Sequence, residues 1–245
     1  MLSQLIQVTK KAAKSRGIVL DRFRPHMDKF HVLGRLCRDH DCSLILDVGA
    51  NDGGFARDMF TAGWERPIIS VEPLEDPWRA IHAASMGRSN WTVTQRMCLG
   101  DRDGYTSFNV AANSVSSSVL DVLPKSIESN ADTRYVEKVE VPIRKLDSLA
   151  GADEQLYAAK RFALKLDVQG FEGAVLDGAV ATLPRIPVLI AEMSLSPLYA
   201  GAPSFEELYS RLIAAGYTCS GIYPGFTDPA SMRMLQVDGI FERIK

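Results

Sequence analysis

The segment from Leu44 to Phe60 constrains the fold more than any other part of the chain. Its apolar run 44–46 is typical of a buried strand, which we expect at 44–48, and the amphipathic run 55–60 is typical of a helix. Between them lies a glycine-rich turn, residues 49–54, and Asp47 stands just before it. A strand that leads through such a turn into a helix is the arrangement that binds nucleotide-type cofactors at the carboxyl end of a parallel strand.

Strands and helices alternate along most of the remaining chain, which predicts a parallel sheet covered by helices on both faces. We expect further strands at 68–72, 91–98, 162–168 and 188–193. We expect helices at 54–62, after an N-cap at Asp76, at 171–182, and after a capping box formed by Ser204 and Glu207. The final segments, 217–223 and 232–244, are strand-like with no room for a helix between them. A mostly parallel, seven-stranded sheet ending in an antiparallel hairpin is the Rossmann-like class I methyltransferase fold, which we predict for this α/β chain.

Residues 104–144 interrupt the alternation after the third strand. Segments 105–110 and 136–144 have the pattern of half-buried strands, and a serine-rich loop lies between them. We expect an inserted β hairpin or lid near the site. The serines of the loop could line an acceptor site or simply form a flexible polar loop, and they are Ser114, Ser116, Ser117 and Ser118.

The first 42 residues are expected to form a helical extension of a domain that spans residues 43–245. Residues 1–40 contain nine Lys and Arg against three Asp, a net charge of +6 that leaves −8 for the rest. Such a basic arm could meet nucleic acid, anionic lipid or an acidic partner. However, Phe23, Met27, Phe30 and Cys37 recur at helical spacing, so we favour a helix that covers the edge of the domain.

Composition and targeting signals favour an ordinary globular protein in a reducing compartment. The chain is 46% hydrophobic and 24% charged, and its four cysteines form no C-x-x-C pair. No apolar run approaches the ~20 residues of a membrane span, and residues 1–20 have no apolar signal core. We therefore expect a cytoplasmic protein with no transmembrane segment and no nucleic-acid partner, whose oligomeric state the sequence leaves open.

The residues around the glycine-rich turn indicate the cofactor. Glycines allow a sharp turn and a close ligand approach, and the amides at the start of the helix would face a carboxylate or phosphate. Asp47 could accept from a cationic amine, and Glu72, at the next strand end, from both hydroxyls of a ribose. S-adenosylmethionine carries all of these groups. The expected cofactor-binding residues are Asp47, Gly49, Ala50, Asn51, Gly53, Phe55, Glu72 and Leu99.

The glycine-rich turn has two alternative explanations. A dinucleotide site needs G-x-G-x-x-G, whereas the chain has Gly49-x-x-x-Gly53-Gly54, which disfavours an NAD-dependent oxidoreductase. The turn could also be purely structural, with Asp47 capping it. An acid, a loop and a second acid, each at a strand end, favour the cofactor site.

Three segments resemble the FkbM-type S-adenosylmethionine-dependent methyltransferase family. They are Leu46-Asp47-Val48-Gly49-Ala50-Asn51-x-Gly53, Val71-Glu72-Pro73 and Leu164-Lys165-Leu166-Asp167-Val168-Gln169-Gly170-Phe171-Glu172. The third is similar to the family signature Lys-x-Asp-Val-Glu/Gln-Gly-x-Glu. The resemblance covers about residues 43–195 and implies methyl transfer, usually to an oxygen of a sugar or secondary metabolite.

The candidate catalytic residues are Asp167, Glu192 and Lys165. Asp167 ends the fourth strand, Lys165 shares its side of that strand, and Glu192 lies near the end of the neighbouring strand. Methyl transfer to a hydroxyl requires an aligned acceptor and removal of its proton. We expect Asp167 to be the base or to orient the hydroxyl, with Glu192 second. Asp167 and Glu192 could instead hold a divalent cation that lowers the pKa of the acceptor.

Other polar residues of the signature have structural explanations. The structural explanation for Glu172 is that it complements a helix dipole. The structural explanation for Lys165 is that it pairs with an acid, and for Gln169-Gly170 that it shapes a turn. The four histidines lie on expected helices away from strand ends, which makes each a poor candidate for a base. The sequence thus predicts an O-methyltransferase acting on a hydroxyl of a small-molecule or glycan acceptor. The alternatives are a non-catalytic cofactor-binding or scaffold protein of the same fold and, less favoured, an oxidoreductase.

Overall fold

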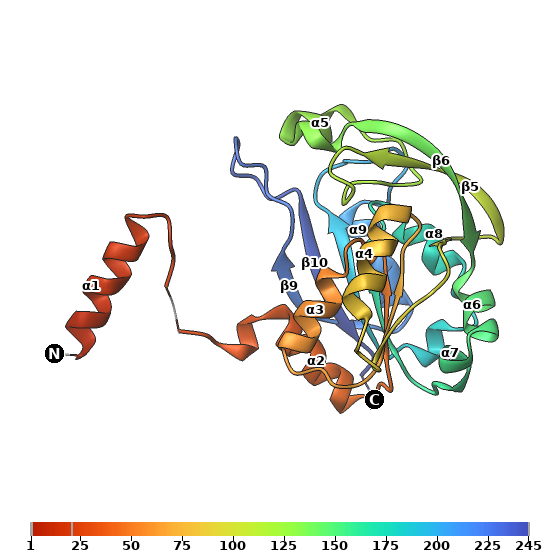
Figure 1. Ribbon diagram of the computed structural model, residues 1–245, viewed down its shortest axis with the longest axis horizontal. Coiled ribbons are helices and arrows are strands. Elements are labelled where there is room, and N and C mark those ends of the chain that lie inside the picture. The colour runs from red at the N-terminus through yellow and green to blue at the C-terminus, as the bar shows by residue number, and fades with distance from the viewer. Residues whose placement is uncertain (1, 21, 245) are drawn as a thin grey trace.

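Figure 1 shows a central sheet with helices on both faces. The computed structural model describes residues 2–20 and 22–244, so Met1, Asp21 and Lys245 of the two expected parts lie outside it. Within this range a seven-stranded sheet has the order β3-β2-β1-β7-β8-β10-β9. Its strands are β1 (Ile45–Val48), β2 (Ile68–Val71), β3 (Trp91–Val93), β7 (Ala163–Leu166), β8 (Val188–Ser194), β9 (Thr218–Pro224) and β10 (Gln236–Glu242). The strands from β3 to β8 in this order are parallel, whereas β10 is antiparallel to β8 and β9, which confirms the class I methyltransferase fold.

Hydrophobic clusters fill the space on each face of the sheet. Because neighbouring residues of a strand point to opposite faces, Ile45 belongs to one cluster and Leu46 to the other. The Ile45 face is covered by α2 (Lys29–Asp39), α3 (Gly54–Thr61) and α4 (Glu75–Ser85). The Leu46 face is covered by α6 (Leu146–Ala152), α7 (Glu154–Ala158), α8 (Glu172–Asp177) and α9 (Phe205–Ala214), the last with the predicted capping box. Burial on both faces explains the nearly continuous apolar runs of the parallel strands.

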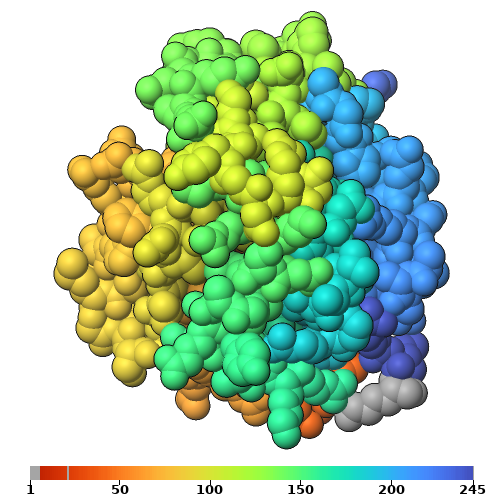
Figure 2. Space-filling model, turned by 90° about the vertical axis from the view of Figure 1, so that its right-hand side faces the viewer, coloured from red at the N-terminus to blue at the C-terminus, as the bar shows by residue number. Residues whose placement is uncertain are grey.

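The expected insertion supplies two strands of a second, three-stranded sheet of order β4-β6-β5, in which β4 (Cys98–Leu99) comes before the insertion. Strand β5 (Gly104–Ala111) pairs antiparallel with β6 (Tyr135–Arg144), and α5 (Pro124–Ser129) and η2 (Ala131–Thr133) lie in the connection between them. In Figure 1 the insertion lies above the carboxyl ends of the parallel strands. Figure 2 shows that it packs directly on the body of the molecule, coloured yellow to green. The insertion therefore covers the edge at which the sequence places the site.

Two predictions near the third strand are wrong. The expected strand 91–98 is divided into β3 and β4 (Cys98–Leu99), because β4 leaves the main sheet and pairs with β6 of the insertion. The helix α4 begins at Glu75, so Asp76 lies inside its first turn and is not the N-cap. The residue at the N-cap is Leu74, whose backbone amide donates to Oε1 of Glu72 at 2.9 Å. The side chain of Glu72, directly after β2, thus sets the start of the helix.

The expected helix 171–182 is also shorter, because α8 ends at Asp177. A Cβ at Gly178 would lie 2.0 Å from the carbonyl oxygen of Gly100, so the chain passes very close to the segment after β4 here. Beyond this crossing, the backbone amides of Ala181 and Thr182 donate to the carboxylate of Asp147. The short helix η3 (Leu183–Arg185) follows.

The N-terminal region contains two dissimilar helices. Helix α1 (Leu2–Lys14) extends away from the body in Figure 1, whereas α2 packs on it with Leu33 and Cys37 fully buried. The expected apolar stripe begins too early, because Phe23 and Met27 are 61% and 63% exposed. Phe23 precedes the short helix η1 (Pro25–Met27) and Met27 ends it, whereas α2 begins only at Lys29 after an N-cap at Asp28.

Candidate functional site

Two adjoining cavities lie at the carboxyl ends of the parallel strands. The first has a volume of about 280 Å³ and lies beneath the insertion. The second has a volume of about 480 Å³ and lies between α2, the glycine-rich turn and β10. Both are lined by Gly49, Asn51, Asp167, Glu192 and Phe226, so a ligand can extend from one cavity into the other.

The glycines of the turn are required by the protein itself. Gly49 has a φ of 74°, and a Cβ there would lie 1.9 Å from the carbonyl oxygen of Asp167. Gly53 has a φ of 84°, and a Cβ there would lie 2.7 Å from the ring of Trp91. Gly49 lines both cavities, whereas Gly53 lines neither of the two, and its contact with a cofactor stays a prediction.

The surroundings of Asp47 give it contacts within the protein. Its side chain is fully buried, lines neither of the two cavities, and accepts from the hydroxyl of Ser70 at 3.2 Å. Its Oδ1 lies 3.2 Å from the ammonium nitrogen of Lys165, because the two residues are in register on the adjacent strands β1 and β7. Asp47 therefore supports the site from beneath through Lys165 and Ser70, and its contact with a ligand amine stays a prediction.

Glu72 lies in the wall of the first cavity, as its expected role requires. It is 5% exposed, and its Oε2 accepts from the backbone amide of Asn51 at 2.8 Å while its Oε1 accepts from Leu74. Burial raises the pKa of Glu72 to about 7, although both amides favour the charged form. The two amides fix the carboxylate and leave lone pairs for a ligand, since a carboxylate can accept about four hydrogen bonds.

The remaining predicted cofactor residues are divided between the cavities. Leu99 lines the first, Ala50 and Phe55 line the second, and Asn51 lines both. Asn51 has a φ of 45°, and its side-chain amide donates to the hydroxyl of Ser114 at 3.3 Å. This bond ties the glycine-rich turn to the serine-rich loop of the insertion.

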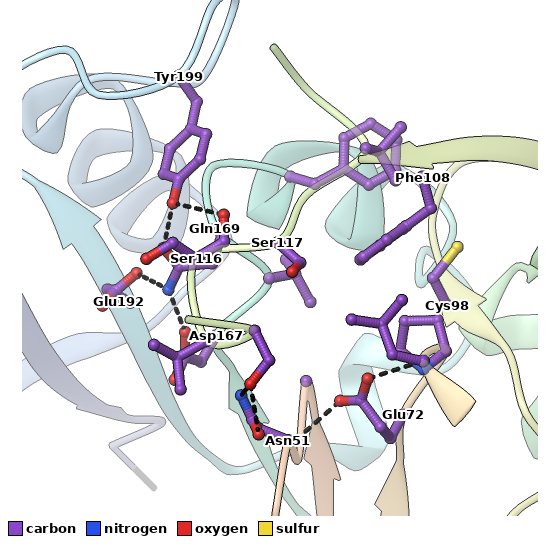
Figure 3. Close-up of a pocket in the computed structure, with 18 of the residues that line it drawn as sticks. Asn51, Glu72, Cys98, Phe108, Ser116, Ser117, Asp167, Gln169, Glu192 and Tyr199 are labelled. Atoms are coloured by element: carbon purple, nitrogen blue, oxygen red, sulfur yellow. Dashed lines mark hydrogen bonds between the residues drawn. The ribbon is translucent and has the colours of Figure 1, made fainter. Parts of the chain in front are cut away.

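Gln169 connects the two candidate catalytic carboxylates. Its side-chain nitrogen donates to Oδ1 of Asp167 and to Oε2 of Glu192, each at 2.8 Å, and its side-chain oxygen accepts from the hydroxyl of Tyr199 at 2.6 Å. Figure 3 shows this amide between the two acids at one wall of the first cavity. Gln236 also donates to Oε2 of Glu192, at 2.6 Å. The sequence predicts none of these amide contacts, because Gln236 lies on a distant strand and the pattern Gln169-Gly170 is typical of a turn.

The network is electrostatically asymmetric. Burial, followed by the nearby carboxylates of Asp167 and Glu172, raises the pKa of Glu192 well above its ordinary value. Lys165 donates to the carbonyl oxygen of Gly49 at 2.6 Å and lies 3.5 Å from Oδ2 of Asp167. Burial acts to lower the pKa of Lys165, but the Asp47 and Asp167 carboxylates outweigh it and raise that pKa. Lys165 is therefore held as a cation between the carboxylates of Asp47 and Asp167.

The arrangement does not favour the cation expected as an alternative between Asp167 and Glu192. The amide nitrogen of Gln169 occupies the space between these carboxylates and presents hydrogen atoms to both. Across the part of the chain that the structure describes, no group of three or more His, Cys, Asp or Glu side chains is placed to hold a metal ion.

Glu172 shapes the signature loop. It is 3% exposed, and its Oε1 accepts from the backbone amides of Val168 at 3.0 Å and Gly170 at 3.3 Å. The loop that carries Gln169, whose φ is 54°, is therefore held by a buried carboxylate. From the sequence, Glu172 is expected only to complement the helix dipole. Its two hydrogen bonds to the loop give it a more specific role.

Comparison with known families identifies the chain's relatives. The family described as the methyltransferase FkbM domain matches residues 47–219. The chain belongs to the FkbM methyltransferase family. It is thus a methyltransferase of an S-adenosylmethionine-dependent family, in agreement with the resemblance noted in its sequence.

Individual relatives are more distant. The chain is 28% identical over 187 residues to the 2-O-methyltransferase NoeI of Sinorhizobium fredii, covering 66% of this chain and 72% of that protein. Among solved structures it is similar to the methyltransferase domain of the bacterial protein CtHen1-C, with a TM-score of 0.45, 8% identity, and coverage of 91% and 100% of the two chains. A Streptococcus thermophilus rRNA methylase gives a TM-score of 0.45 at 12% identity, with coverage of 92% and 100%. Both scores lie below 0.5, and the fold assignment rests instead on the strand order.

No helix in the described ranges combines the length and the apolar character needed to cross a bilayer.

Proposed function

We propose that this protein transfers the methyl group of S-adenosylmethionine to a hydroxyl oxygen of a carbohydrate or related polyhydroxylated metabolite. The name of the NoeI relative supports the oxygen acceptor. A wall of hydroxyl and amide side chains in the first cavity supports an acceptor rich in hydroxyls, and it includes Ser114, Ser116, Ser117, Gln169, Tyr199 and Gln236. Such groups both donate to and accept from hydroxyls.

The residues present fit the cofactor. Glu72 would accept from the ribose hydroxyls, because its carboxylate is fixed by two amides at the wall of the first cavity. Leu74 and Leu99 offer apolar surface in the same cavity for the adenine ring of the cofactor. When bound, S-adenosylmethionine supplies an electrophilic methyl group.

The single observation that carries the catalytic proposal is the position of Asp167. Its side chain is 39% exposed, borders both cavities, and is oriented by Gln169 on one oxygen and Lys165 near the other. We infer that this carboxylate accepts the proton of the acceptor hydroxyl as the oxygen attacks. Glu192 has the raised pKa of a group that stays protonated to higher pH, which suits it to donate to and orient the acceptor.

The test has two stages. Titration calorimetry first measures S-adenosylmethionine binding, and transfer of labelled methyl to a panel of oligosaccharides and polyhydroxylated metabolites then identifies acceptors. The Asp167→Asn variant should bind the cofactor within about twofold of the wild type but lose about 10²-fold or more in kcat, the usual contribution of a general base. A matched control is Asp177→Asn, because Asp177 is exposed and pairs with Arg211 on the protein surface.

Full activity of Asp167→Asn on an identified acceptor would remove its proposed role. Cofactor binding without transfer to any hydroxyl would favour the non-catalytic alternative, and absence of binding would reject the cofactor assignment.

A further inference from the structure

Lys29 and Asp238 bring an ion pair to the second cavity from outside the region that matches the family. Lys29 begins α2 and Asp238 lies in the middle of β10, whereas the match spans residues 47–219. The ammonium nitrogen lies 2.5 Å from Oδ2 of Asp238, and both residues line the cavity. The pair is accessible, since 31% of the Lys29 side chain and 17% of the Asp238 side chain are exposed.

The lysines of this cavity differ in the anions they can bind. An ammonium group has three donors. Lys165 already faces three oxygens at 2.6–3.5 Å, those of Gly49, Asp47 and Asp167, and its side chain is only 8% exposed. Lys29 donates to Asp238 and retains exposed surface, so its ammonium can bind a second anion.

The second cavity is lined mainly by acids, so an anionic ligand group can bind there only beside a cation such as Lys29. The acids in its lining are Asp52, Asp58, Asp167, Glu192 and Asp238. They outnumber the lining lysines, so a ligand carboxylate placed here is repelled unless a lysine faces it directly. The same acids favour an ammonium group. The ion pair of Lys29 and Asp238 is therefore complementary to a ligand that carries a carboxylate and an ammonium group, as an α-amino acid does.

The position of the cavity identifies which part of the cofactor it would hold. Glu72, the ribose acceptor of the proposed function, lies in the first cavity. The second cavity continues from it past Gly49, Asn51 and Asp167. A nucleoside at Glu72 thus directs the remainder of the cofactor toward Lys29.

We propose that Lys29 binds the carboxylate of the amino-acid end of S-adenosylmethionine, and that Asp238 positions Lys29 and accepts from the adjacent ammonium. This inference rests on the proposed function. It makes α2 part of the cofactor site, although the sequence suggested only a covering extension there.

The test compares ligands with and without the amino-acid end. Titration calorimetry on the full chain measures S-adenosylmethionine, S-adenosylhomocysteine and 5′-methylthioadenosine, the last of which lacks the amino acid. In Lys29→Met the first two should bind about 10- to 100-fold more weakly, the range expected for a lost charged hydrogen bond. The affinity for 5′-methylthioadenosine should stay within twofold. Lys29→Arg should restore part of the loss, and Lys160→Met, at an exposed position outside both cavities, should change nothing.

Equal weakening of all three ligands in Lys29→Met would overturn the inference, because it would indicate a general disturbance of the site. Unchanged S-adenosylmethionine affinity would also overturn it, while leaving the proposed function intact. If the wild type binds none of the three, the cofactor assignment itself fails and takes this inference with it. Asp238→Asn, with its melting temperature checked, provides an independent variant and should weaken the two amino-acid ligands selectively.

Discussion

At the scale of single residues, the site depends on carboxylates that the fold buries and then restrains. Glu72 is the clearest example, because burial raises its pKa while the amides of Asn51 and Leu74 hold the charged form. Its pKa of about 7 compares with an ordinary value of 4.5. The folded protein therefore binds a proton more tightly at Glu72 than the unfolded chain does.

This difference predicts how stability depends on pH. A group whose pKa is raised on folding stabilises the protein fully below its unfolded pKa, and that contribution is lost as pH rises through the folded pKa. For Glu72 the loss occurs between pH 4.5 and about 7. We expect the ligand-free protein to lose stability from this group across that window, and Glu72→Gln to have a shallower dependence than the wild type. Calorimetric melting temperatures at pH 5 and pH 7.5 compare the two, and parallel curves would contradict the burial argument.

Gly49 is a second residue whose replacement has a calculable effect. Gly49→Ala places a Cβ 1.9 Å from the carbonyl oxygen of Asp167 at a φ of 74°. The conformation alone costs about 1–2 kcal/mol, and the contact must also displace the end of β7. Gly63→Ala is a matched control, because Gly63 has a φ of 84° and nothing within 4 Å of the added atom. Gly49→Ala should lower the free energy of unfolding more than the control and also weaken cofactor binding; equal losses would show that only the backbone conformation matters.

At the scale of elements, prediction succeeded where local pattern and tertiary contacts agree. The apolar runs of β1, β2, β7 and β8 fit strands buried on both faces, and such runs are visible in any window of sequence. The strand expected at 91–98 failed because Cys98 and Leu99 pair with Ile143 and Arg144 of β6, each 45 residues later. The helix expected at 171–182 failed because of the close approach of Gly178 to Gly100. Both errors arise from contacts that the local sequence does not contain.

The same distinction explains the site. Glu72 and Asp167 could be placed at one edge because the carboxyl ends of parallel strands meet there. The pairing of Asp47 with Lys165 could not be predicted, since it requires the register of β1 on β7. Lys29 and Asp238 are 209 residues apart, and only the reversed strand β10 brings them together.

The hydroxyl of Ser118 attaches the insertion to the signature loop that carries Gln169, and a substitution can test this attachment. Ser118 is fully buried, donates to the backbone oxygen of Gln169 at 2.7 Å, and accepts from the amide of Leu120. We expect Ser118→Ala to lower the free energy of unfolding by about 1–3 kcal/mol, because it leaves buried polar groups without partners. Ser107→Ala, at an exposed position of β5, should be nearly neutral in the same denaturant titrations. A neutral Ser118→Ala would show that the insertion is held by other contacts.

At the scale of the whole molecule, the N-terminal region changes near residue 28 from a segment without buried residues to one that contributes to the core. None of the residues described between 6 and 27 is buried, whereas α2 places Leu33 and Cys37 in the core. Removal of residues 1–27 should therefore leave the melting temperature nearly unchanged. Removal of residues 1–40 should lower it strongly, since burying a large apolar side chain contributes about 1.5–3 kcal/mol. Thermal unfolding of both truncated proteins checks this boundary. A large fall in melting temperature on removal of residues 1–27 would show that the segment containing α1 stabilises the body.

The contacts between α2 and β10 also have a consequence for how the protein is made. Lys29 meets Asp238 and His40 meets Glu242, so each contact joins residues more than 200 positions apart. During synthesis, α2 leaves the ribosome long before β10 exists, and non-local contacts of this kind form late. The contact of Asn51 with Glu72 joins residues only 21 positions apart and can form earlier, but the second cavity closes only when β10 has been added. The cofactor would then meet a fully formed site at the last step of folding, when bound ligand can stabilise only the finished fold.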